Sequence, residues 1–182
     1  MRIIAGKLRS RKFEAPPGDS TRPTGDKARG ALFNILHRLT ENARVLDGFA
    51  GSGALSFEAL SRGAAEAVMF ELDRGTAKLL ENNARSLGVL SQTEIRQVDF
   101  LAGAPALAGR IFDLVFLDPP YAAGLLTDAI EVSGGLLAPG GVIVAEHSSG
   151  DTLPDTLGSL VKTGTRTYGA AAFSFYKRQE DQ

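Results

Sequence analysis

Apolar runs and amphipathic stretches alternate along the chain from residue 44 to residue 148. The apolar runs are short and nearly continuous: RVLDGFA (44–50), AEAVMFEL (65–72), TEIRQVD (93–99), RIFDLVFLD (110–118) and PGGVIVAEHS (139–148). The stretches between them place apolar residues at helical spacing: GALSFEALSRGA (53–64), RGTAKLLENNARSLG (74–88) and GLLTDAIEVSGGLL (124–137). Strands that are apolar on both faces and alternate with helices are typical of a parallel sheet covered on each side. The pattern therefore predicts an α/β fold with a doubly wound, mostly parallel sheet.

The C-terminal stretch breaks this alternation. In SLVKTGTRTYGAAAFSFYKRQ (159–179), two β-rich runs flank YGAA. This pattern indicates a terminal antiparallel hairpin with one strand inserted into the sheet. Together with the five apolar runs, the hairpin predicts a seven-stranded sheet.

The region before residue 44 has a different organisation. EAPPGDSTRPTGD (14–26) is rich in Pro, Gly, Ser, Thr and Asp and is typical of a loop. Apolar residues then recur at helical spacing, so we expect a helix from about residue 25 to TENAR (40–44), with Thr24 or Asp26 as its cap. We divide the chain into an N-terminal extension with its helix, residues 1–40, and a main domain, residues 41–182.

Composition narrows the class of protein. With 182 residues, 43% of them hydrophobic, the chain can bury the core of one compact domain. The chain has no cysteine, which excludes disulfides and cysteine zinc sites. It has two histidines, His37 and His147, which disfavours a His-rich metal site, and we expect no bound metal. No apolar run approaches the roughly 18 residues of a membrane span, and the N-terminus lacks the apolar region of a secretory signal. We expect a soluble, cytoplasmic protein.

Charge is distributed unevenly. Residues 1–29 hold eight Lys or Arg against three Asp or Glu, a net charge of +5, whereas the remainder carries −6. A basic N-terminal arm on an acidic body could bind RNA phosphates, and a solvated tail that aids solubility is the alternative. The candidate phosphate-binding residues are Arg2, Lys7, Arg9, Arg11, Lys12 and Arg22.

A glycine-rich loop, VLDGFAGSGALSFEAL, joins the first strand to its helix. Gly51 and Gly53 allow the backbone to approach a ligand and turn into the helix, and Asp47 lies at the strand end. A dinucleotide-binding loop requires a third glycine where Ser56 stands, and a phosphate-binding P-loop requires a Gly-Lys-Ser/Thr sequence that is missing here. The loop therefore favours a nucleoside ligand without a pyrophosphate, and an ordinary tight turn is the alternative.

Four successive strands end in an acid: Asp47, Glu71, Asp99 and Asp118. Because the carboxyl ends of parallel strands meet at one edge of a sheet, these acids should line that edge. Glu71 is placed to accept both hydroxyls of a ribose, and Asp73 either competes with it or starts the next helix. Asp99 is placed to accept from an adenine amino group while the neighbouring Phe100 packs on the ring.

These segments resemble a known class of enzyme. LDGFAGSGALSFEALSRGA, FELD, QVDF and LDPPY are together similar to class I S-adenosylmethionine-dependent methyltransferases of Rossmann-like fold. The DPPY tetrapeptide, residues 118–121, is similar to the signature of enzymes that methylate exocyclic amines of bases. MRIIAGKLRSRKF, RPTGDKARGALFNIL and YGAAAFSFY extend the resemblance to the bacterial guanine-N2 methyltransferases of small-subunit (16S) ribosomal RNA, collinearly from Met1 to Tyr176.

The resemblance implies specific roles. It implies S-adenosylmethionine as cofactor, ribosomal RNA or an assembling small subunit as partner, and a monomer. Asp118 and the Pro119 carbonyl would accept from the target amine, Pro119 and Pro120 would fix these acceptors, and Tyr121 would stack on the base. The implied cofactor-binding residues are Asp47, Phe49, Gly51, Gly53, Glu71, Leu72, Asp99 and Phe100.

The chain departs from the family pattern at three places. Gly30 stands where the family usually has Glu, Gly48 where it has a bulkier residue, and alanines 170–172 where it has a Thr. These departures bear on RNA contacts more than on the cofactor site. Two other functions stay open: adenine-N6 methylation of DNA or RNA, and nucleoside binding by a non-catalytic RNA-interacting protein. Arg29, Asn34 and His147 are further residues that could face the substrate.

Overall fold

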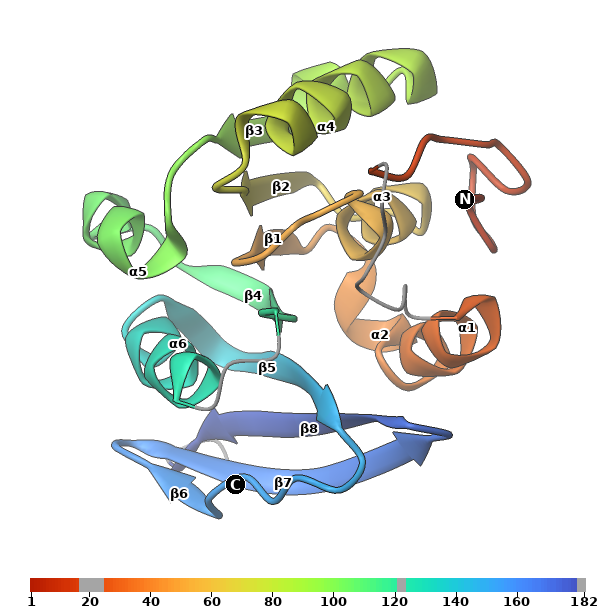
Figure 1. Ribbon diagram of the computed structural model, residues 1–182. Coiled ribbons are helices and arrows are strands. Elements are labelled where there is room, and N and C mark those ends of the chain that lie inside the picture. The colour runs from red at the N-terminus through yellow and green to blue at the C-terminus, as the bar shows by residue number, and fades with distance from the viewer. Residues whose placement is uncertain (17–24, 121–123, 180–182) are drawn as a thin grey trace.

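A single sheet of eight strands runs through the computed structural model, which describes residues 1–16, 25–120 and 124–179 (Figure 1). The strand order is β3-β2-β1-β4-β5-β8-β7-β6. The first five strands are parallel, and β8 pairs antiparallel with β5. The strands are β1 (Arg44–Asp47), β2 (Glu66–Phe70), β3 (Thr93–Arg96), β4 (Phe112–Leu117), β5 (Leu137–Ser148), β6 (Thr156–Leu157), β7 (Leu160–Tyr168) and β8 (Ala171–Arg178).

Helices cover both faces of the sheet, and each face has its own apolar cluster (Figure 1). Leu32, Phe33 and Phe57 belong to the cluster on the face of α1, α3 and α4, and Phe112 and Ile130 belong to the cluster on the face of α5 and α6. The helices are α1 (Asp26–Ile35), α2 (His37–Thr40), α3 (Ala54–Ser61), α4 (Arg74–Leu87), α5 (Phe100–Gly103) and α6 (Leu125–Gly134), with short 3-10 turns at Leu90–Gln92 and Ala104–Leu107.

The predicted doubly wound α/β fold with a terminal hairpin is confirmed, including the insertion of β8 between β5 and β7. The sheet has eight strands rather than the predicted seven because the two-residue strand β6 adds an edge beyond β7. So short a segment carries no periodicity that the sequence could reveal. Among the described residues, no helix is long and apolar enough to cross a membrane.

The helix predicted to begin near residue 25 is broken. It forms α1 and α2, separated at Leu36. Gly25 occupies the cap position with no side-chain hydrogen bond, and Asp26 instead forms ion pairs with Arg2 and Arg29. Thr24, the other proposed cap, lies outside the described residues.

The basic N-terminal segment is packed against the domain rather than extended as an arm. Ile3 and Phe13 are 1% and 5% exposed and belong to the cluster beside α1, α3 and α4. Arg2 and Lys12 form an antiparallel bridge, so the segment doubles back on itself. One apolar cluster therefore extends across the boundary predicted at residue 40.

Gly30 provides a test of local stability. It lies inside α1, and a β-carbon there would meet only the Ile4 side chain, at 3.7 Å. Since glycine costs a helix interior about 0.5–1 kcal/mol relative to alanine, we expect Gly30→Ala to raise the free energy of unfolding by that amount in urea denaturation. A loss of stability would contradict this account. Gly53→Ala is the contrasting variant and should destabilise, because its φ is +80° and its β-carbon would lie 2.4 Å from the Phe57 ring.

Candidate active site

A cavity of about 380 Å³ opens at the carboxyl ends of the parallel strands. All four predicted strand-end acids line it: Asp47, Glu71, Asp99 and Asp118. Its volume lies within the range of small-molecule sites. The prediction that these acids share one edge of the sheet is therefore confirmed.

The glycine-rich loop forms one side of the cavity. Gly51, with φ +51°, lines the cavity and has open space where a β-carbon would stand. Gly53 is the N-terminal cap residue of α3 and does not line the cavity, because it packs against Phe57 and Leu80. We predicted ligand approach at both glycines, but in this structure Gly53 serves the turn and the close packing of α3.

Asp47 is buried at the end of β1, with 2% of its surface exposed. Its Oδ2 accepts from the Ser56 hydroxyl at 2.8 Å, and its Oδ1 accepts from the Phe49 N–H at 3.4 Å. Burial raises the pKa of Asp47 to about 7, against the opposing effect of these two hydrogen bonds. Ser56 thus holds the cavity acid, a role that the loop sequence does not reveal, since in the pattern of glycines Ser56 marks only the absence of a third glycine.

Glu71 connects the glycine loop to the start of α4. Its Oε2 accepts from the Gly51 N–H at 3.0 Å and its Oε1 from the Asp73 N–H at 2.8 Å. Asp73 caps α4 by accepting from the Thr76 N–H at 2.7 Å, so its interpretation as a helix start is confirmed. A carboxylate can accept about four hydrogen bonds, which leaves Glu71 able to accept from a ribose. Leu72 also lines the cavity and is 66% exposed.

Asp99 lines the cavity and caps α5, where its Oδ1 accepts from the Ala102 N–H at 3.0 Å. Phe100 does not line the cavity: it is 1% exposed and packs edge-on against Phe49 and Phe70. Among the described residues, Phe49 and Phe70 are the aromatic residues of the cavity wall. The predicted packing of Phe100 on a ligand ring is therefore not met in this structure, because as the first residue of α5 it turns into the core.

Asp118 follows β4, and its side chain is accessible to solvent in the cavity. Desolvation raises the pKa of Asp118 well above the usual range, and the negative charges of Glu146 and Asp47 raise it further. Asp47 lies on the neighbouring parallel strand, where it pairs with Phe116, two residues before Asp118. Pro119 and Pro120 line the cavity, and Tyr121 lies outside the described residues.

Most of the proposed RNA-binding residues of the N-terminal segment have intramolecular partners. Arg11 donates to the carbonyls of Ser86 and Leu87 at the end of α4. Lys7 contacts Gln92, and Arg2 pairs with Asp26. Arg9 and Lys12 are exposed, and their side chains have no hydrogen-bond or ion-pair partner in the described part of the chain. Arg22 lies outside the described residues.

Two further candidate substrate residues are buried. Arg29 is 0% exposed, so it does not face a substrate. His147 is 6% exposed, with Nδ1 2.9 Å from the Ser148 carbonyl and Nε2 2.8 Å from the Ser174 hydroxyl. Both histidine nitrogens are thus engaged within the sheet. Asn34 is exposed on α1.

Several cavity residues were missed in the sequence. Met1 and Pro16 reach the cavity from the N-terminal segment, and Thr76 and Leu125 reach it from α4 and α6. Only packing of the segment onto the domain brings the first pair there, so no motif could have identified them. Gly48, a departure from the family pattern, packs under Leu117: a β-carbon there would lie 2.8 Å from the Leu117 side chain.

Comparison with known proteins gives a consistent result. The family model described as Conserved hypothetical protein 95 matches residues 1–177. The chain is 36% identical to "Ribosomal RNA small subunit methyltransferase D" of Escherichia coli (strain K12), over 98% of this chain and 90% of that protein. It is 41% identical to the protein of the same name from Haemophilus influenzae, over 80% of this chain and 78% of that one.

Solved structures agree on the fold. The structure of yhhF from Escherichia coli superposes with a TM-score of 0.87 at 36% identity, covering 98% of this chain and 97% of that one. A SAM-dependent methyltransferase from Thiobacillus denitrificans, solved with S-adenosyl-L-homocysteine, superposes with a TM-score of 0.62 at 23% identity, covering 77% of this chain and 55% of that one. The second likeness concerns the fold alone.

The raised pKa of Asp47 predicts how stability depends on pH. Between about pH 4 and pH 7 the unfolded chain loses the Asp47 proton while the folded chain keeps it. The contribution of the protonated Asp47 to the free energy of unfolding is therefore complete below pH 4 and is lost as the pH rises through 7. We expect Asp47→Asn to be more stable than wild type by about 2 kcal/mol near pH 8, with a smaller difference near pH 5. Urea denaturation at both pH values measures this. A difference that does not vary with pH would contradict it, and Asp151→Asn, at an exposed site, is the control.

Proposed function

The chain belongs to the Conserved hypothetical protein 95 family, and from that premise we propose that it transfers a methyl group from S-adenosylmethionine to the exocyclic N2 of a guanine in small-subunit ribosomal RNA. Its fold is that of class I methyltransferases, and its cofactor is S-adenosylmethionine. One observation carries the proposal beyond the family: the four strand-end acids converge on a single cavity that includes Asp118, Pro119 and Pro120.

The described residues fit this cofactor. The apolar side chains of Phe49, Phe70 and Leu72 offer a surface for the adenine ring, and Glu71 offers carboxylate oxygens to the ribose hydroxyls. Asp47 and Gly51, which line the same cavity, would hold the amino acid portion. The carboxylates around the cavity favour a ligand that carries positive charge, and the cofactor's sulfonium supplies the reactive methyl group.

Asp118 is the proposed acceptor for the target amine. The lone pair of an exocyclic guanine nitrogen is delocalised into the ring, so the nitrogen is a weak nucleophile. A hydrogen bond from its N–H to the Asp118 carboxylate stabilises the positive charge that develops as the new N–C bond forms. Pro119 and Pro120 fix φ near −65°, which holds the acceptor and the Pro119 carbonyl in place before the base arrives. A stacking role for Tyr121 rests on the family resemblance alone.

We propose guanine rather than adenine as the target base on the strength of the relatives, because the cavity does not distinguish the two. A hydrogen-bond acceptor beside two prolines suits either amine. The names of the relatives, which specify small-subunit ribosomal RNA, support the RNA substrate, and the resemblance of the N-terminal segment supports guanine N2. The target base must be unpaired or flipped out, since a base amine inside an RNA double helix cannot reach a cavity at the edge of the protein's sheet.

Replacement of Asp118 tests the reaction. We expect Asp118→Ala to lower the rate of methyl transfer at least about 100-fold, because the acceptor for the developing positive charge is lost. Labelled methyl transfer to small-subunit particles and to their protein-free RNA, followed by nuclease digestion and mass analysis, should give N2-methylguanosine with wild type and with the Asp151→Asn control. N6-methyladenosine as the product would overturn the substrate, and full activity of Asp118→Ala would overturn the mechanism.

The RNA-binding role of the basic segment can be tested separately. Because the Lys12 side chain is exposed and pairs with no group in the described part of the chain, Lys12→Gln should weaken RNA binding without loss of stability and reduce the slope of log affinity against log salt by about one. Lys78→Gln is the control, since this ammonium is paired with Glu81 on α4. An unchanged salt slope in Lys12→Gln, measured by filter binding, would rule Lys12 out as a phosphate contact.

A further inference from the structure

The N-terminal segment, residues 1–16, contributes to the cavity through both of its ends. Met1 and Pro16 line the cavity, whereas the residues between them run along α3 and α4. The positions of these two wall residues therefore depend on how the segment is attached to the helices. The attachments are buried polar side chains, one set near each end of the segment.

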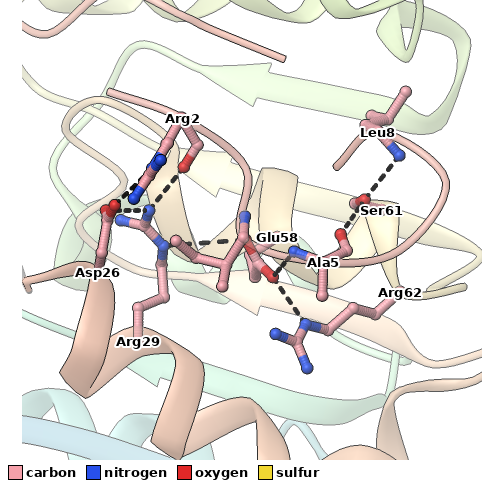
Figure 2. Close-up of polar contacts among 9 residues, drawn as sticks. Arg2, Ala5, Leu8, Asp26, Arg29, Glu58, Ser61 and Arg62 are labelled. Carbon is pink, nitrogen blue, oxygen red and sulfur yellow. Dashed lines mark hydrogen bonds and ion pairs between the residues drawn. The ribbon is translucent and has the colours of Figure 1, made fainter. Parts of the chain in front are cut away.

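Glu58 on α3 holds the segment near Met1 (Figure 2). Its side chain is fully buried, and its carboxylate accepts from two consecutive backbone groups, the Ile4 N–H at 2.8 Å and the Ala5 N–H at 3.1 Å. Arg62 donates to the same carboxylate at 2.7 Å. Two backbone donors on one fixed carboxylate define the path of the chain at Ile4 and Ala5, three and four residues after Met1.

Ser61, one turn further along α3, holds the middle of the segment (Figure 2). It accepts from the Leu8 N–H at 2.9 Å and donates to the Ala5 carbonyl at 2.6 Å. Gly6 passes so close that a β-carbon would lie 2.0 Å from the Ser61 carbonyl oxygen. The segment is thus seated directly on α3, with no room for a side chain between them.

Asn83 on α4 holds the segment near Pro16. The Asn83 side chain, in a residue 3% exposed, accepts from the Glu14 N–H at 3.0 Å and donates to the Glu14 carbonyl at 2.9 Å. These two hydrogen bonds satisfy the N–H and the carbonyl of Glu14, which lies two residues before the cavity-lining Pro16. Arg11 adds hydrogen bonds to the last carbonyls of the same helix.

The two helices that hold the segment are also the helices that begin at the cavity. α3 starts at the glycine loop, and α4 follows its cap residue Asp73, whose N–H donates to Glu71. We propose that Glu58 and Asn83 are positioning residues for the cofactor: through them Met1 and Pro16, at the two ends of the N-terminal segment, form a fixed part of the wall of the cofactor cavity. This inference rests on the proposed function, because it takes S-adenosylmethionine as the ligand of the cavity.

The charges around Glu58 determine which variant is informative. Arg29 is completely buried, and its Nη2 donates to the Arg2 carbonyl and to Asp26, while its Nε lies 3.9 Å from Glu58 and makes no hydrogen bond (Figure 2). Removal of the Glu58 charge leaves this guanidinium with less compensation, which threatens folding as well as cavity geometry. Asn83 is neutral, so Asn83→Ala loosens the wall without exposing an unpaired charge.

The experiment compares cofactor affinity with stability. Isothermal titration with S-adenosylmethionine and thermal melting are measured for wild type, Asn83→Ala and Thr40→Ala, with Glu58→Gln included if it folds. Thr40→Ala is the matched control: Thr40 is 1% exposed, bonds the Leu36 carbonyl and does not line the cavity. At a temperature well below the melting temperature of the variant, we expect Asn83→Ala to raise the Kd for S-adenosylmethionine at least about fivefold. The kcat of Asn83→Ala at saturating cofactor should stay within about twofold of the wild-type value.

The outcomes separate the two proposals. A lower melting temperature in Asn83→Ala together with a wild-type Kd, as expected for Thr40→Ala, would mean that the segment is merely structural and would overturn the inference. Wild type that binds the cofactor but methylates no ribosomal RNA would overturn the proposed substrate, while a raised Kd in Asn83→Ala would still support the wall. Wild type that binds no S-adenosylmethionine would overturn both.

Discussion

The arrangement of parallel strands brings negative charges together, and much of the rest of the structure depends on that constraint. β1, β2 and β4 end at the same edge of the sheet, so Asp47, Glu71 and Asp118 meet around one cavity with Asp99. Carboxylates that are close together and partly desolvated resist ionisation, as the raised pKa values of Asp47 and Asp118 indicate. The free protein is less stable because of this arrangement, and a ligand with positive charge at the cavity relieves the repulsion.

Hydrogen bonds to the acids partly offset this cost. Ser56 donates to Asp47, and the backbone N–H groups of Gly51 and Asp73 donate to Glu71. The same bonds orient the carboxylates before a ligand arrives. The clustered carboxylates thus lower the stability of the free protein and at the same time are preorganised for binding, a common relation in active sites.

The sequence predicted the parts of the molecule that follow from local periodicity and strand ends. The alternation of apolar runs and amphipathic stretches predicted the sheet and its covering helices, and the acid after each strand predicted the cavity edge. The sequence could not reveal interactions between distant segments. Nothing local to Met1 or Pro16 indicates a place in the cavity, and the charge pattern of residues 1–29 suggested an arm because it does not show that Ile3 and Phe13 anchor the segment in the core. The direction of the Phe100 ring was equally hidden: it packs into the core beside Phe49 and Phe70, and adjacency to an acid does not determine which way a ring points.

The claim that the acidic edge is built for a cationic cofactor can be measured as proton release on binding. Titration calorimetry of S-adenosylmethionine near pH 7, in buffers of different ionisation enthalpy, counts the protons exchanged. Because a positive charge beside Asp47 lowers a pKa that lies at about 7 in the free protein, the account predicts release of up to roughly half a proton from this group at pH 7, declining toward pH 9. Neutral adenosine should release fewer. The claim would be contradicted if S-adenosylmethionine bound tightly but released no more protons than adenosine does.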